Sequence, residues 1–317
     1  MNNIRSIGIL FLFTIALGTS AQSQNISDLL NDFGITEIAR DYLQPAADAV
    51  GYSFNSGLYH TAEVEQGFNL WVGMRGVWTF VPEDEKSFTA VLPEEMVSLG
   101  YPSQVTTATV LGDKGALLQS SMQDAPDVQL PGGINTSSTY IFMPHAVVGS
   151  FAGFNLMVRG IPPVEFDSDV GEVSFVGAGL KFSPTHFTQH NQAARQRFDV
   201  ALMVAAQRFE AGDYLTVVNY NANVHASINF GLLTLFSGVG FERYNIDVAY
   251  TYDPPDDLAP DAPPSLLTPK SIELGFNRDN FRYTVGADLT LIALLNISAD
   301  YSFGVQDNFS FGVGVKL

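Results

Sequence analysis

The chain has 317 residues, and its 33 Asp and Glu residues outnumber its 15 Lys and Arg residues, giving a net charge of -18. This balance argues against the basic face by which proteins bind nucleic acid, so no nucleic-acid partner is expected. The chain contains no cysteine, which excludes disulfide bonds as a source of stability. Its length suits either two ordinary domains or one large β-barrel.

The first residues have the pattern of a secretory signal peptide. Arg5 supplies a positive charge, residues 7–17 are apolar, and Thr19 and Ala21 occupy the small-residue positions of an A-x-A-like cleavage site. The apolar run is too short for a transmembrane helix, which needs about 20 residues. The sequence therefore predicts export and a cleaved signal peptide at residues 1–21.

Residues 22–66 are predicted to form a periplasmic N-terminal segment that plugs the rest of the protein. Apolar residues recur at three- and four-residue steps between Ile26 and Leu43, which predicts a helix over residues 27–50. Pro45 is expected to kink or end this helix, and Gly51 is a weaker stop signal.

From Gly67 onward the apolar residues alternate with polar or small ones. In the last eleven residues, Phe309, Val313 and Leu317 share one face, while Asn308 and Ser310 share the other. The same period of two defines ten predicted strands: 67–81, 138–149, 150–161, 170–183, 196–208, 213–230, 234–252, 279–293, 294–304 and 307–317. Three further segments, 87–92, 106–112 and 270–276, are candidates for additional strands.

This pattern predicts an all-β protein, an antiparallel transmembrane β-barrel of 10–12 strands, 14 at most, at residues 67–317. Alternation also fits a soluble all-β sandwich. The barrel is favoured because the apolar faces suit the 9–11 residues of a transmembrane strand, while single charges occur on the opposite faces. Connections near 149–150, 231–233 and 293–294 are short, whereas 82–137 and 253–278 are long, acidic and rich in proline, as in bacterial outer-membrane barrels. The predicted location is the outer membrane, with lipid as a partner.

Charged residues on the non-apolar faces are predicted to line the lumen. They are Arg75, Arg159, Lys181, Arg197, Asp199, Glu242, Arg282, Asp288 and Asp300. A second set of inward positions repeats a small-apolar-small-apolar-charge pattern, and its glycines are predicted to contact the plug: Gly177, Gly179, Gly238, Gly240, Gly312 and Gly314. The alternative is that these glycines relieve strain in a tightly curved barrel.

No motif for catalysis, cofactor binding or a metal site is complete. The glycines open no helix and form no phosphate-binding loop, and there is no GxSxG elbow. His186 and His190 have a spacing seen in zinc sites but no third ligand, and the acids of residues 253–261 fit no calcium loop. His60, His145 and His225 stand singly in the sequence. The expectation is a protein without enzymatic activity, cofactor or metal ion.

Several motifs are similar to those of an uncharacterised family of Gram-negative outer-membrane proteins. These are the segments 39–45 (ARDYLQP), 54–62 (FNSGLYHTA), 67–70 (GFNL), 130–133 (LPGG) and 238–242 (GVGFE). The resemblance covers nearly the whole mature chain and implies an outer-membrane barrel without an established activity. An N-terminal segment before a barrel also resembles, at the level of fold alone, the long-chain fatty-acid transporters.

The sequence thus favours a channel or transporter for small molecules, with hydrophobic molecules among the candidates. The alternative is a non-conducting structural or surface-interaction protein, whose acidic loops meet a partner or the divalent cations of the lipopolysaccharide layer. Oligomeric state is left open by the sequence.

Overall fold

In the computed structural model, the structure describes residues 36–123, 125, 127–167, 171–187, 198–252, 270–291 and 294–317. The predicted signal peptide and the first part of the predicted helix, residues 27–35, lie outside the described residues. The chain forms two compact units. One contains the described residues within 1–49, 81–139 and 247–276, and the other contains those within 50–80, 140–246 and 277–317.

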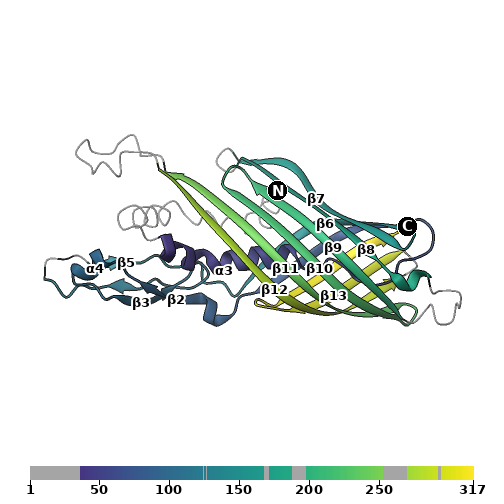
Figure 1. The fold of residues 1–317 in the computed structure, drawn as a ribbon, viewed down its shortest axis with the longest axis horizontal. Coiled ribbons are helices and arrows are strands. Elements are labelled where there is room, and N and C mark those ends of the chain that lie inside the picture. The colour runs from purple at the N-terminus through teal and green to yellow at the C-terminus, as the bar shows by residue number, and fades with distance from the viewer. Residues whose placement is uncertain are drawn as a thin grey trace, which may run out of the picture. The chain divides into compact units, whose positions relative to one another are not determined.

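Ten antiparallel strands close into a β-barrel, which confirms the predicted fold class (Figure 1). Around the barrel, β1 is followed by β14 and then by each preceding strand back to β6. The strands are β1 (Asn69–Phe80), β6 (Ser138–Phe151), β7 (Phe154–Asp167), β8 (Gly171–Phe182), β9 (Asp199–Ala211), β10 (Leu215–Asn229), β11 (Leu233–Tyr252), β12 (Lys270–Leu291), β13 (Leu295–Phe303) and β14 (Asn308–Lys316).

Each predicted strand corresponds to one strand of the barrel, but the three additional candidates do not enlarge it. Residues 270–276 are the beginning of β12, which starts nine residues before the predicted 279. The other two candidates overlap β2 (Ser87–Val91) and β3 (Gln104–Ala108), which pair only with each other. The segment predicted as a long outer loop, 82–137, is therefore a folded region.

The polar and apolar faces of the strands separate as the alternation predicts. On β14, Asn308 and Ser310 are fully buried, whereas Phe309 and Val313 are 37% and 40% exposed. The same alternation occurs on the other strands, because successive side chains of a strand point to opposite faces. The barrel consequently has a polar interior and an apolar outer surface that no described residue covers.

The two ends of the barrel differ in their connections. At the end where the chain terminates, β6 and β7 are joined by a two-residue turn, and both Ala152 (φ 50°) and Gly153 (φ 82°) have the positive φ that such hairpins require. This turn lies three residues after the short connection that the sequence predicts near 149–150. Residues 230–232 form another short turn there, and Leu317 pairs with Leu70. We call this the short-turn end; β1 ends at the opposite one, the long-loop end.

The first unit has its own small core. It contains β2 and β3, a second pair β4 (Leu117–Leu118) and β5 (Val128–Gln129), the 3-10 helix η1 (Glu83–Lys86) and the helix α4 (Glu94–Ser98). Leu92, Met96 and Leu118 pack in one of its apolar clusters. In another cluster, Tyr42 donates a hydrogen bond to the carbonyl of Gly132 (2.6 Å), and burial raises the pKa of Tyr42 to about 12.

The helix α3 (Thr36–Phe54) begins in the first unit and ends in the second. The helix continues past Pro45, so this residue does not end the helix, as had been predicted as one possibility. Gly51 does not end the helix either. A proline inside a helix costs one backbone hydrogen bond, because it has no N–H to donate. Among the described residues, no helix has the length and apolar character needed to cross a bilayer.

Candidate functional site: the plugged interior of the barrel

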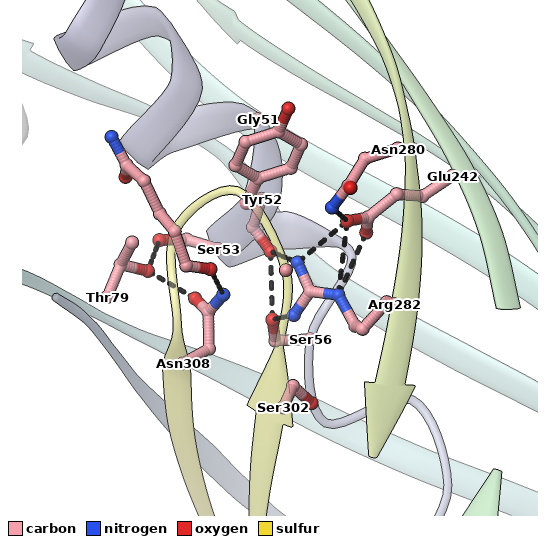
Figure 2. Close-up of polar contacts among 12 residues, drawn as sticks. Gly51, Tyr52, Ser53, Ser56, Thr79, Glu242, Asn280, Arg282, Ser302 and Asn308 are labelled. Atoms are coloured by element: carbon pink, nitrogen blue, oxygen red, sulfur yellow. Dashed lines mark hydrogen bonds and ion pairs between the residues drawn. The ribbon is translucent and has the colours of Figure 1, made fainter. Parts of the chain in front are cut away.

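Residues 50–66, which we call the internal segment, run lengthwise through the barrel. Near its start, the hydroxyls of Ser53 and Thr79 lie 2.5 Å apart, at the long-loop end (Figure 2). Further along, the backbone N–H of Ala62 donates to Ser227 (3.0 Å). At its close, Glu65 forms an ion pair with Lys316, the last residue of β14. The segment therefore crosses from the long-loop end to the short-turn end.

The chain enters the barrel at the long-loop end, crosses it, and turns back into β1 at the short-turn end. The internal segment therefore runs antiparallel to β1. The predicted plug was the segment 22–66 with a helix over residues 27–50, and the part that lies inside the barrel is the last turn of α3 and the irregular residues that follow it.

Arg282 holds the C-terminal end of α3. Its Nη2 donates to the carbonyl of Tyr52 (3.1 Å) and its Nη1 to the hydroxyl of Ser56, while Nη2 also forms an ion pair of 3.0 Å with Glu242 (Figure 2). Asn280 donates to the same carboxylate (2.8 Å). The last carbonyls of a helix lack partners within the helix and carry partial negative charge, so a buried guanidinium stabilises this end.

Arg159 binds the residues that follow the helix. Its Nη1 donates to the carbonyls of Phe54 (3.3 Å) and Ser56 (3.0 Å), and its Nη2 donates to that of Gly57. The Nε of Arg159 donates to Nδ1 of His145 (2.9 Å). Gly57 has a φ of 60°, a backbone conformation that glycine adopts without strain, and this allows the chain to turn toward the guanidinium.

Two further cations of the wall contact the internal segment nearer the short-turn end. Arg75 shares a hydrogen bond of 2.9 Å with Nδ1 of His60, and its Nη1 donates to Ser298 (2.7 Å). Lys181 donates from Nζ to the carbonyls of Thr61 (3.0 Å) and Glu63 (2.9 Å). Four of the predicted lumen residues are thus basic side chains that bind the internal segment: Arg75, Arg159, Lys181 and Arg282.

The predicted acidic residues face the interior, and no hydrogen bond or ion pair from them to the internal segment occurs among the described residues. Glu242 pairs with Arg282, and Asp288 accepts a hydrogen bond from Asn296 (2.7 Å). Asp300 is buried on β13. Asp199 accepts from Thr185 (2.7 Å), beside the 3-10 helix η2 (Pro184–Phe187), and so belongs to a connection at the short-turn end. Arg197 lies outside the described residues.

The glycines predicted to contact the plug have different neighbours. A Cβ added at Gly238 would lie 2.3 Å from the hydroxyl of Tyr59 in the internal segment. At the other five positions, the nearest atoms come from barrel strands. Large inward side chains lean over the glycines of neighbouring strands: Gln207 at Gly177, Met157 and Met203 at Gly179, Asn223 at Gly240, Arg75 at Gly312, and Trp71 at Gly314.

Several uncharged residues of the site were not predicted. Gln207 donates to the carbonyl of Phe54 (2.7 Å), and Asn219 donates to that of Gly51 (2.5 Å). His225 stacks on the ring of Tyr59, with 3.9 Å between the ring centres. A signal was present on β10, where polar side chains recur at every second position: Asn219, Asn221, Asn223, His225 and Ser227.

An open cavity of about 910 Å³ occupies the short-turn half of the interior. Its apolar lining includes Leu58, Trp71, Val147, Met157 and Met203, and its charged lining consists of Glu63, Glu65, Lys181, Asp288 and Lys316. Arg159 and Arg282, which bind the internal segment, are not part of its lining.

The described part of the chain contains no group of three His, Cys, Asp or Glu residues that could hold a metal ion. His186 bonds through Nδ1 to the carbonyl of Val64 (2.9 Å), whereas His190 and the acids of residues 253–261 lie outside the described residues. The three histidines that stand singly in the sequence, His60, His145 and His225, all have partners in the fold.

Residues 1–317, the whole chain, match a family described as "Family of unknown function (DUF6588)". No curated protein is detectably similar to the chain.

Solved structures similar to this chain include other barrels. The translocator domain of autotransporter NalP from Neisseria meningitidis is 11% identical, with a TM-score of 0.29, covering 87% of this chain and 98% of that one. OmpTdeltaL8, an outer membrane protein of Vibrio cholerae, is 7% identical with a TM-score of 0.27, covering 79% and 99%. A FadL homologue of Pseudomonas aeruginosa is 9% identical with a TM-score of 0.25, covering 78% and 89%.

Proposed function

We propose that this chain, which belongs to the DUF6588 family of unknown function, is an outer-membrane channel for small molecules that its own internal segment holds closed. The observation that carries the proposal is the course of residues 50–66 through a closed barrel, with basic side chains of the wall bonded to their carbonyls.

The outer surface of the barrel supports insertion in a membrane. Large apolar side chains stand exposed on strand after strand, among them Val176, Val204, Val239 and Phe281. A soluble protein rarely exposes so continuous an apolar surface. In a bilayer the same surface is favourable, and a closed barrel leaves no backbone group without a partner in the hydrocarbon.

The connections indicate the orientation of the barrel. Bacterial outer-membrane barrels have short turns on the periplasmic side and longer loops outside. By this rule the short-turn end, with Leu317, faces the periplasm. The cavity then opens to the periplasm, and the long-loop end faces outward.

The hydrogen bonds from the basic wall residues to the internal segment favour a movable gate over a permanent plug. Hydrogen bonds from charged donors each contribute on the order of 1.5–3 kcal/mol, so a few of them hold the segment closed. The segment itself is irregular after Phe54 and shares no backbone ladder with the strands, so its displacement would leave the barrel intact. The empty half of the interior already gives it space into which to move.

Conductance in planar bilayers tests this proposal. The wild-type protein is expected to stay closed for most of the time, and the double variant Arg159→Met, Arg282→Met is expected to open frequently. The control is Val204→Ala on the outer face, 58% exposed in the barrel, which should behave as wild type. If the double variant inserts but conducts no more than wild type, the gate is refuted.

A second function is favoured by the first unit. Its own apolar clusters show a separately folded body, which suits a non-conducting protein that presents this body to a partner. Silence of all three proteins in the bilayer, with insertion confirmed by protease protection, would favour this second function.

A further inference from the structure

We propose that the cavity at the short-turn end binds a small zwitterion with an apolar side group, such as a short peptide with free termini. This inference rests on the proposed function, since it names the class of molecule that the channel would take. Nothing in the family match assigns a ligand to this barrel.

The first observation is a buried cation whose hydrogen-bond partners are backbone carbonyls and not carboxylates. Lys181 is 6% exposed and lines the cavity. Two of its three N–H donors are bound to the carbonyls of Thr61 and Glu63, and it forms no ion pair with any described residue. A buried charge is costly unless it is paired, so this ammonium group favours a negatively charged ligand group.

The second observation is a buried acceptor without a donor. Asp288 is 5% exposed, and only one of its carboxylate oxygens accepts a hydrogen bond, from Asn296. Its Oδ1 is buried and has no partner among the described residues. Asp288 lines the same cavity, where it favours a ligand with a positively charged or donating group.

The charges lie on different walls. Lys181 belongs to β8 and Asp288 to β12, with β9, β10 and β11 between them in the ring of ten strands. The two groups therefore face each other across most of the barrel. A ligand that meets both must carry its positive and negative groups several bonds apart, as the two termini of a short peptide are.

The total charge of the lining argues against a simple anion. The three carboxylates of Glu63, Glu65 and Asp288 outnumber the two ammonium groups of Lys181 and Lys316. Lys316 is already paired with Glu65. A neutral zwitterion supplies a carboxylate to the ammonium group of Lys181 and adds no net charge to a cavity in which negative residues are in excess.

The apolar lining supplies the remaining contact. Leu58, Met157, Met203 and Ala205 form a cluster, and Met203 is the register partner of Lys181 on the adjacent strand. A side group attached near the ligand carboxylate would lie against these methionines. The volume of about 910 Å³ is within the roughly 300–1,000 Å³ of small-molecule sites.

Calorimetric titration of the full-length protein in detergent tests the proposal with three probes. They are the dipeptide alanyl-leucine, its N-acetylated form, which keeps only the negative charge, and its C-terminal amide, which keeps only the positive charge. The dipeptide should bind about tenfold more tightly than either derivative, because each derivative leaves one buried group unpaired.

Variants assign the two charged contacts. Lys181→Met should abolish the preference for the dipeptide over the amide, and Asp288→Asn should weaken the preference over the N-acetylated form. The matched control is Lys316→Met, which removes an ammonium group that already has a partner and should leave both preferences unchanged. Asp288→Asn is nearly isosteric, so it remains informative if the lysine variant does not fold.

Equal affinity for the three probes, or no binding of any of them, would overturn the inference. Those results would leave the gate untouched, because the conductance of the Arg159 and Arg282 variants is measured without any ligand. Conversely, a silent double variant together with selective dipeptide binding would refute the channel and retain the binding site.

Discussion

Arg282 and Glu242 form an ion pair inside the barrel, with 3.0 Å between Nη2 and Oε1 and both side chains almost fully buried. The same guanidinium donates to the carbonyl of Tyr52 at the end of α3. The next residue along β11, Arg243, points outward and forms an exposed pair with Asp279 (2.5 Å). Two ion pairs of the same strands thus differ mainly in burial.

The buried pair is predicted to contribute far more to stability than the exposed one. Glu242→Ala leaves the guanidinium of Arg282 buried and unpaired, and this should lower the free energy of unfolding by about 3–5 kcal/mol. The matched control, Asp279→Ala, removes an equal charge from a pair about half exposed, and because water screens such a pair the loss should be much smaller. Urea unfolding of both variants in detergent micelles, followed by tryptophan fluorescence, measures the difference. Similar losses would contradict the burial of the pair.

A methyl group at Gly238 is predicted to disturb the internal segment. The Cβ of Gly238→Ala would lie 2.3 Å from the hydroxyl of Tyr59 and 2.7 Å from Cβ of His225, so the stacked rings must shift. Overpacking of this kind costs about 1–3 kcal/mol. Gly240→Ala, two residues further on the same inward face, has its nearest neighbour at 3.0 Å and should cost less. Thermal unfolding of the two variants provides the comparison, and a larger loss at Gly240 would argue against the contact with Tyr59.

The sequence was sufficient for the barrel because one physical rule applies along every strand. Polar Asn308 and apolar Phe309 must face opposite sides, and this alternation marks each of the ten strands. The alternation does not show at which residue the pairing between two strands begins or ends. β12 begins at Lys270, nine residues before the predicted residue 279.

The site was predictable only in part, for a different reason. Charged inward residues such as Arg159 stand out in an apolar strand, but their partners are carbonyls of the internal segment, which have no sequence signature. The direction in which residues 50–66 cross the barrel depends on long-range contacts, such as that of Ser53 with Thr79. Alternation along the strands contains no information on that direction.

The orientation of the barrel predicts that the long-loop end is reachable from outside the cell. Because the native chain has no cysteine, a single Asp213→Cys substitution in the exposed turn between β9 and β10 at this end gives a unique label site. In intact cells, a maleimide-polyethylene glycol too large for porins should modify this cysteine. The control is Leu232→Cys in a turn of the short-turn end, which should react only after the outer membrane is permeabilised. Labelling of Leu232→Cys alone in intact cells would reverse the orientation.

The passage of the internal segment through the barrel is tested most directly by pairs of cysteines introduced into this cysteine-free chain. The hydroxyls of Ser53 and Thr79 lie 2.5 Å apart, and those of Thr61 and Ser227 lie 3.3 Å apart. Disulfide bonds need Cβ atoms about 3.5–4.5 Å apart, so each of these two pairs should cross-link under mild oxidation. The exchanged pairs, Ser53 with Ser227 and Thr61 with Thr79, should not, because their members lie near opposite ends of the barrel. Cross-linking of the first two pairs alone, read by the mass of a tryptic peptide pair, is the result expected; cross-linking of the exchanged pairs, or of none, would contradict the threaded segment.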